Sequence, residues 1–130
     1  MSSIFVIYAP NDESLFERLK TQAKTARLSV DFEGARVKQP WVAGWKGQCR
    51  TKISKSDCVI VLISKNTAQG GIEWEVQCAR EFDQSMLGIH VDKARGGAVP
   101  DLLRDVNVIE WNWPDIEKFI RSATGSSAFA

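Results

Sequence analysis

The apolar run Cys58–Ile63 constrains the fold of this chain more than any other stretch. It is unbroken and rich in β-branched residues, a pattern typical of a strand that is buried on both faces at the centre of a parallel sheet. Polar residues and glycines occupy 64–71, and a helical pattern begins at about Ile72. The run therefore predicts a strand–loop–helix unit of an α/β fold.

Apolar runs and helical patterns alternate along the rest of the chain. Strands are expected at 4–9, 28–32, 58–63, 87–91 and 106–111, and helices at 12–26, 41–54, 72–82 and 113–123. This alternation predicts a flavodoxin-like sheet of parallel strands in the order 2-1-3-4-5, with helices on both faces. We expect residues 1–124 to form one domain and the small, polar residues 125–130 to form a flexible tail.

Charge and composition exclude several classes of partner. The formal net charge is +1, which favours neither nucleic acid nor an anionic membrane. No apolar run approaches the roughly 20 residues that span a bilayer, and no signal-peptide pattern opens the chain. Cys49, Cys58 and Cys78 are odd in number and fall in predicted helices or strands. They are interpreted as reduced core thiols, which predicts a cytoplasmic protein.

Several kinds of chemistry lack their motifs. There is no phosphate-binding glycine loop and no cluster of cysteine and histidine with metal spacing, so no metal or cofactor is expected. No serine has the pattern of a nucleophile elbow. His90 is the one histidine and lies in a predicted strand, where a structural role is expected.

Glu75 is the candidate catalytic residue. It follows Ile72 by three positions and precedes Ala79 by four, so it shares the apolar side of its helix. It also comes soon after the central strand, and ligands bind at the carboxyl ends of strands in open α/β sheets. The alternative is that Glu75 only stabilises the N-terminus of the helix electrostatically.

The crevice between the first and third strands predicts the substrate site, because the strand order reverses there. Its walls would be 8–12 and 64–75, and Asn11 or Asp12 would also cap the first helix. Aromatic residues could stack on a base, although such residues are also common in cores. The expected substrate-binding residues are Tyr8, Ala9, Pro10, Asp12, Phe32, Trp41, Asn66, Thr67 and Trp74.

A single carboxylate can serve one class of reaction. It stabilises or attacks the cationic ribose carbon when a glycosidic bond breaks, and usually a second acid protonates the leaving group. A leaving group that departs neutral, such as nicotinamide from NAD, needs no such acid. Glu75 alone is therefore chemically sufficient for that bond.

Five stretches resemble the TIR domain family, and within it the TIR-like branch of the Thoeris anti-phage defence subunit ThsB. They are 4–12, 31–45, 53–67, 72–79 and 108–116, and they cover nearly the whole chain. The most specific part is Ile53–Ala79, with Ser56-Asp57 before the central strand and Trp74-Glu75 after it. The chain departs from the family pattern at Gly71, where an aromatic residue is usual.

The resemblance implies an activity and its partners. Enzymatic members of the family cleave NAD at the nicotinamide–ribose bond, and their catalytic glutamate corresponds to Glu75. The products would be ADP-ribose or a cyclic or conjugated signal, in anti-phage or stress defence. NAD would be the substrate and not a cofactor. The chain would form homo-oligomers through the loop Glu33–Pro40, and a separate effector protein would sense the product.

Two other functions remain open. The domain could be a non-catalytic TIR scaffold that acts by homotypic assembly. It could also resemble the nucleoside deoxyribosyltransferases, which share the fold and use a glutamate on a similar helix.

Overall fold

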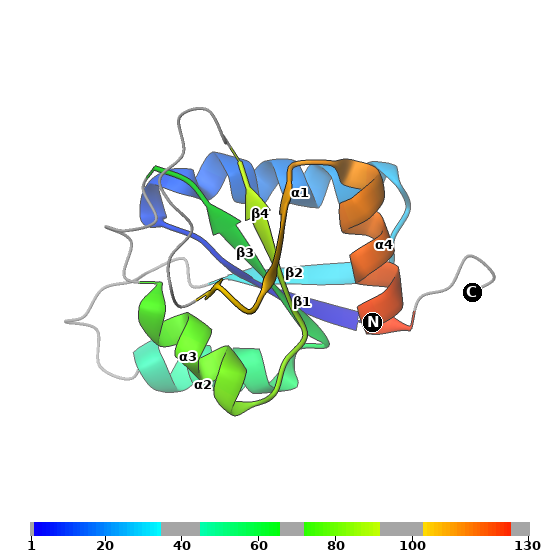
Figure 1. The fold of residues 1–130 in the computed structure, drawn as a ribbon. Helices are drawn as coiled ribbons and strands as arrows, with labels where there is room; N and C mark the ends of the chain where they lie inside the picture. The colour runs from blue at the N-terminus through cyan, green and yellow to red at the C-terminus, as the bar shows by residue number, and fades with distance from the viewer. Residues whose placement is uncertain (1, 35–44, 66–71, 92–102, 126–130) are drawn as a thin grey trace.

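A computed structural model of the chain describes residues 2–34, 45–65, 72–91 and 103–125. Strands and helices alternate along it as expected (Figure 1). The strands are β1 (Ser2–Ile7), β2 (Val30–Gly34), β3 (Cys58–Ile63), β4 (Met86–His90) and β5 (Asn107–Glu110). The helices are a short 3-10 helix η1 (Pro10–Asp12), α1 (Glu13–Thr25), α2 (Trp45–Lys55), α3 (Glu73–Glu81) and α4 (Trp113–Thr124).

The strands form one parallel sheet in the order β2-β1-β3-β4-β5. This confirms the predicted flavodoxin-like order. The strand order reverses between β1 and β3, which pair directly from Ile4 with Cys58 to Ile7 with Val61. The carboxyl ends of these two strands therefore flank the place where ligands bind in open α/β sheets.

The central strand β3 is buried along its whole length, as the continuous apolar run predicts. Its side chains alternate between two core clusters. Cys58, Ile60 and Leu62 join the cluster formed with α1 and α4. Val59, Val61 and Ile63 join the cluster formed with α2 and α3. The two pairs of helices thus cover opposite faces of the sheet (Figure 1).

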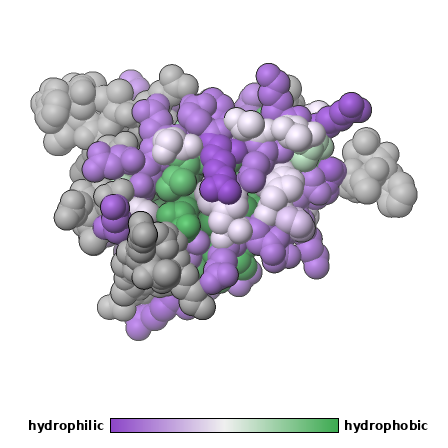
Figure 2. All heavy atoms as spheres, turned by 90° about the horizontal axis from the view of Figure 1, so that it is seen from above, coloured by the Kyte–Doolittle hydropathy of each residue, from purple (hydrophilic) through white to green (hydrophobic). Residues whose placement is uncertain are grey.

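The surface over the α1 layer is largely hydrophilic, with only a small apolar area (Figure 2). This agrees with the amphipathic pattern of α1, which buries Phe16, Leu19 and Ala23 and exposes charged residues. Within the described residues, no helix has both the length and the apolar character that a membrane crossing requires.

The second strand lies further along the chain than predicted. It covers Val30–Gly34, whereas the apolar pattern predicts 28–32. The Leu28 N–H donates to the Ala23 carbonyl, and Arg27 has a left-handed φ of 59°. These are the features of a Schellman cap, so Leu28 closes α1 and does not begin the strand. Glu33 belongs to β2 and not to the predicted loop, whose residues 35–40 lie outside the described part.

The first strand lies two residues earlier than predicted, because β1 covers Ser2–Ile7 and not 4–9. Ser2 and Ser3 already pair with β2, and the Ala9 carbonyl accepts from the Asp12 N–H in the turn of η1.

Other bounds differ by less. β4 is shifted by one residue from the predicted 87–91, and β5 is one residue shorter at each end than the predicted 106–111. Differences of this size are usual at the ends of elements. The observed α2 begins at Trp45, and residues 41–44, where the sequence predicts its start, are not described. α4 begins and ends as its sequence suggests, because Asn112 accepts a hydrogen bond from the Asp115 N–H and Gly125 adopts a left-handed φ of 73°.

Candidate functional site

Glu75 is fully buried in the first turn of α3, with 0% of its surface exposed. The helix turns its apolar side toward the sheet, where Ile72, Val76 and Ala79 are buried in the same cluster as Ile63 at the end of β3. The spacing of Glu75 places it on that side, as predicted. A buried carboxylate is uncommon, because removal of its charge from water is unfavourable unless the surroundings compensate.

Glu73 lies in the same first turn and is exposed. The two acids are separated by about 200° around the helix, which explains why one faces the core and the other the solvent. Trp74, between them, is half-buried and packs against the same cluster. Of the predicted aromatic residues within the described part of the chain, Trp74 is therefore the one that packs against the same cluster as the buried side of α3.

A second pair of buried polar residues lies at the reversal of the strand order. The Ser64 hydroxyl donates a hydrogen bond of 2.5 Å to Asp12 Oδ2. Ser64 directly follows β3, and Asp12 closes η1, which follows β1. Both residues are buried. This contact joins the two predicted walls of the crevice, which follow β1 and β3. It is a strong link, because a carboxylate acceptor strengthens a hydrogen bond.

The sequence predicts Asp12 in the site and as a cap of the first helix, whereas the structure pairs its side chain with Ser64. Asp12 occupies the N-cap position of α1, yet its side chain makes no capping hydrogen bond. Its partner Ser64 was expected only as part of a wall. One sequence signal for this pair is that a polar residue follows each of two apolar runs. Those runs become neighbouring parallel strands, whose carboxyl ends lie side by side.

Tyr8 packs into the core on the α1 side of the sheet. Its ring stacks on Phe16, with the ring centroids 4.8 Å apart and the planes 12° from parallel. It also lies against Gly34 at the end of β2, where a Cβ would meet Tyr8 Cε1 at 2.8 Å. The core cluster that contains the buried side of α3 lies on the opposite face of the sheet. The Tyr8 ring and the apolar residues on either side of Glu75 therefore belong to different clusters.

The remaining predicted substrate-binding residues are divided among several places. Ala9 is buried at the end of β1. Phe32 lies on β2 and packs on the α1 side, away from the stripe on α3. Trp41, Asn66 and Thr67 lie outside the described residues, as does the side chain of Pro10. The family departure at Gly71 also lies outside them.

The three cysteines are buried and make no disulfide, in agreement with their interpretation as core thiols. Burial raises the pKa of Cys58 to about 12. It also raises the pKa of Cys78, which Arg50 lowers and which the charges of Glu81 and Glu75 raise further. Both thiols are thus protonated at neutral pH and are poor nucleophiles. Within the described residues, no group of three or more His, Cys, Asp or Glu side chains could hold a metal ion.

The family model described as "Thoeris protein ThsB, TIR-like domain" matches residues 5–96 of the chain. This chain belongs to the ThsB TIR-like domain family. The matched region begins in β1 and extends beyond β4, so it includes Asp12, Ser64 and Glu75. No curated protein matches the chain.

Solved structures show the same fold. The TIR domain of the Toll-related receptor TRR-2 from Hydra magnipapillata is 18% identical, with a TM-score of 0.63, and the similarity covers 92% of this chain and 96% of that one. A prokaryotic SEFIR domain is 19% identical, with a TM-score of 0.57 and coverage of 100% and 96% respectively. At these identities the similarity supports the flavodoxin-like TIR architecture and no particular activity.

Proposed function

We propose that this TIR-like domain cleaves NAD at the nicotinamide–ribose bond, with Glu75 as the catalytic carboxylate. The observation that carries the proposal is the complete burial of Glu75 in the first turn of α3, just beyond the carboxyl end of the central strand. Membership of the ThsB TIR-like family supports the same reaction.

The burial of Glu75 is what separates a catalytic role from a purely structural one. An acid that only interacts with the helix dipole can stay in water, and the exposed Glu73 does so in the same turn. A second, fully buried acid adds little to that interaction and carries a desolvation penalty. Such a penalty is commonly retained where the charge serves a reaction.

The chemistry needs one negative charge and no general acid. As the bond between the ribose carbon and the nicotinamide nitrogen breaks, its electron pair moves to the positively charged ring, and nicotinamide leaves as a neutral molecule. The ribose carbon becomes cationic, and the Glu75 carboxylate stabilises it. This attraction is strong because a buried site excludes the screening effect of water. Water, or a hydroxyl group in a cyclising or conjugating reaction, then adds to the same carbon and releases a proton.

Other residues of the site would support this step. The Asp12–Ser64 hydrogen bond fixes the segments that follow β1 and β3 relative to each other, at the crevice where the substrate is proposed to bind. Trp74 offers an aromatic surface next to the carboxylate. In this proposal the product, ADP-ribose or a cyclic or conjugated form, acts on a separate effector protein in anti-phage or stress defence, and the domain works in the cytoplasm.

Association between copies is part of the proposal. TIR domains assemble homotypically, and the segment that follows β2 is the proposed joining element. Glu33 itself lies in β2 and is 3.5 Å from Lys52 on α2, so it anchors the start of that segment to the body of the domain.

One set of incubations tests the proposed function against its alternatives. The purified chain is incubated at high concentration with NAD, and separately with a deoxynucleoside plus a free base. Nicotinamide release from NAD is the expected result. Exchange of the base would instead indicate a deoxyribosyltransferase, and no reaction in either mixture, with self-association present, would indicate a scaffold.

A further inference from the structure

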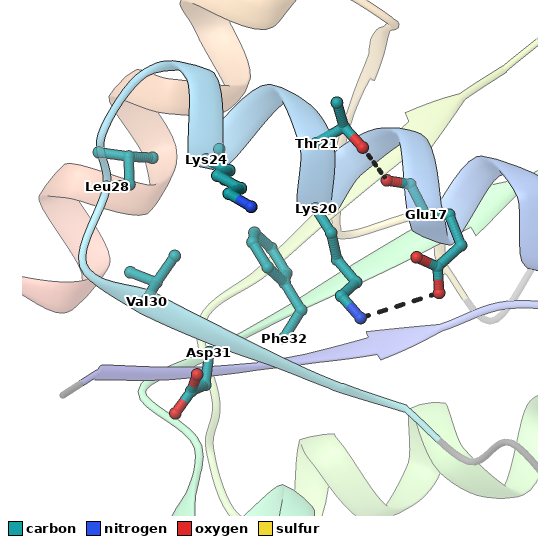
Figure 3. Close-up of a pocket in the computed structure, with 9 residues that line it drawn as sticks. Glu17, Lys20, Thr21, Lys24, Leu28, Val30, Asp31 and Phe32 are labelled. Carbon is teal, nitrogen blue, oxygen red and sulfur yellow. Dashed lines mark hydrogen bonds and ion pairs between the residues drawn. The ribbon is translucent and has the colours of Figure 1, made fainter.

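A groove with a volume of about 460 Å³ separates α1 from the edge strand β2 (Figure 3). Its floor is apolar, because Leu28, Val30 and Phe32 pack against the core cluster while remaining partly exposed. Ala23 of α1 also lines it, and its small side chain leaves space between helix and strand. The volume is within the range of ligand sites in proteins.

Two lysines of α1 extend over this floor. Lys20 and Lys24 are one helical turn apart and lie on either side of the Phe32 ring (Figure 3). Lys20 Nζ is 3.8 Å from Glu17 Oε1 and 5.3 Å from the centroid of the Phe16 ring, so this ammonium group is held near the groove. Lys24 is exposed, and no ion pair to it occurs within the described part of the chain.

The acidic residues of β2 do not cancel this positive charge inside the groove. The Asp31 side chain points away from the Phe32 ring and the lysines (Figure 3). Glu33 is two residues after Asp31, so its side chain lies on the same face of β2 as that of Asp31. It pairs with Lys52 of α2, on the face of the sheet opposite α1. Glu17 of α1 also lines the groove and pairs with Lys20, so Lys24 is the lysine there whose charge no ion pair within the described residues offsets.

Within the described part of the chain, the outer edge of β2 is unpaired. β2 stands at the end of the sheet order, and among the described residues no strand pairs with its outer side. Such an edge presents backbone N–H and C=O groups that a peptide in extended conformation can satisfy. A strand edge beside a helix, with apolar pockets between them, is the arrangement by which several domains bind peptides through strand addition.

We propose that this groove binds an extended, acidic peptide segment of a partner protein, which pairs with the outer edge of β2. Alternate side chains of the peptide point into the groove. One or two of them are apolar and contact Leu28, Val30 and Phe32, and an acidic one lies between Lys20 and Lys24. The intervening side chains face Asp31, so basic residues are favoured there. The site is on the face of the sheet opposite α3, and it therefore does not depend on the proposed NAD chemistry.

Selection from a library of random ten-residue peptides, displayed on phage, tests the proposal with the intact chain. The selected peptides are synthesised with a fluorescent label and titrated with the wild type, with Lys20→Glu/Lys24→Glu, and with Lys55→Glu. Lys55 is an exposed lysine at the end of α2, on the other face of the sheet, and is the matched control. All three positions are on helix surfaces, and thermal unfolding verifies that each variant is folded.

The selected peptides are expected to carry an acidic and an apolar residue at every second position. Their affinity should fall about tenfold or more in the double variant, because two attractive charge pairs become repulsive, and should not change in Lys55→Glu. Amide hydrogen exchange in residues 30–34 should slow when peptide is bound. Failure to select any peptide, equal binding to the double variant, or unchanged exchange in β2 would each overturn the proposal.

Discussion

The Ser64 hydroxyl and the Asp12 carboxylate form a 2.5 Å hydrogen bond across 52 positions of sequence. Both residues are buried at the carboxyl ends of neighbouring parallel strands. In such surroundings a hydrogen bond to a charged acceptor is stronger than in water. The relative position of the two crevice walls therefore depends on this polar contact as well as on apolar packing.

The first prediction concerns this contact. Ser64→Ala removes the hydroxyl donor from a buried carboxylate, so the free energy of unfolding should fall by about 1–3 kcal/mol. Ser54→Ala is the control, because the Ser54 hydroxyl donates to the Thr51 carbonyl at an exposed position and its loss should cost about 0.5 kcal/mol or less. Urea unfolding measures both. Equal stability of the two variants would contradict the importance of the Asp12–Ser64 bond.

The second prediction uses two glycines with different surroundings. A Cβ on Gly34 would lie 2.8 Å from Tyr8 Cε1, whereas a Cβ on Gly47 has no neighbour within 4 Å. Gly34→Ala should therefore destabilise the fold by about 1–3 kcal/mol through overpacking. Gly47→Ala should stabilise it by about 0.5–1 kcal/mol, because alanine suits the helix α2 better. Thermal unfolding checks both, and the prediction is wrong if the two substitutions act in the same direction.

The third prediction concerns the decrease in folding stability at low pH. The Arg80 guanidinium donates to both carboxylate oxygens of Asp105, which lowers the pKa of Asp105 from 3.8 to about 2. Since the pKa is lower in the folded chain, the pair stabilises the fold above the unfolded pKa, and this contribution disappears as the pH falls to 2. The contribution is small, because Asp105 is 64% exposed.

Asp105→Asn tests this dependence. The melting temperature of the variant should be below that of the wild type at about pH 5, and the difference should shrink and vanish as the pH falls through about 2. Added salt should reduce the difference at the higher pH. A difference that persists unchanged down to pH 2 would show that the ion pair is not its cause.

The sequence predicts the centre of the fold well and its edge less well. Cys58–Ile63 matches β3 residue for residue, because a strand buried on both faces needs a continuous apolar run with polar limits. The alternation of strands and helices predicts a parallel sheet, and the observed order is the flavodoxin-like one of the common orders for such a sheet. At the edge strand β2 the signal is weaker, since Leu28 is apolar although it closes a helix, and Gly34 is buried although its residue type favours a loop.

The site is predictable where helix periodicity decides it. The burial of Glu75 and the exposure of Glu73 follow from their spacing alone. Periodicity does not show which face of a sheet a strand residue takes, and Phe32, a predicted substrate-binding residue, lies on the α1 side. It also does not pair residues distant in sequence, which is why Ser64 was not recognised as the partner of Asp12.

The fourth prediction concerns association. If copies must assemble to complete the site, nicotinamide release per molecule should rise with protein concentration and level off once the chain is fully associated. Activity is measured over a dilution series, and sedimentation gives the oligomeric state at each concentration. Constant activity per molecule, at concentrations where only monomer sediments, would remove assembly from the mechanism.

The last prediction concerns Glu75 itself. Glu75→Gln keeps the size of the side chain and removes its charge, so nicotinamide release should fall by about 10²–10³ if the carboxylate stabilises the cationic ribose carbon. If Glu75 only favours the helix N-terminus, activity should change little and the free energy of unfolding should fall by about 0.3–1 kcal/mol.

Glu73→Gln is the matched control for this measurement. It makes the same chemical change in the same helical turn, but at an exposed position, so it alters the helix-end electrostatics without altering the buried site. Thermal unfolding of both variants separates lost chemistry from lost structure. A folded Glu75→Gln variant with wild-type turnover, or loss of turnover only in Glu73→Gln, would show that Glu75 is not the catalytic carboxylate.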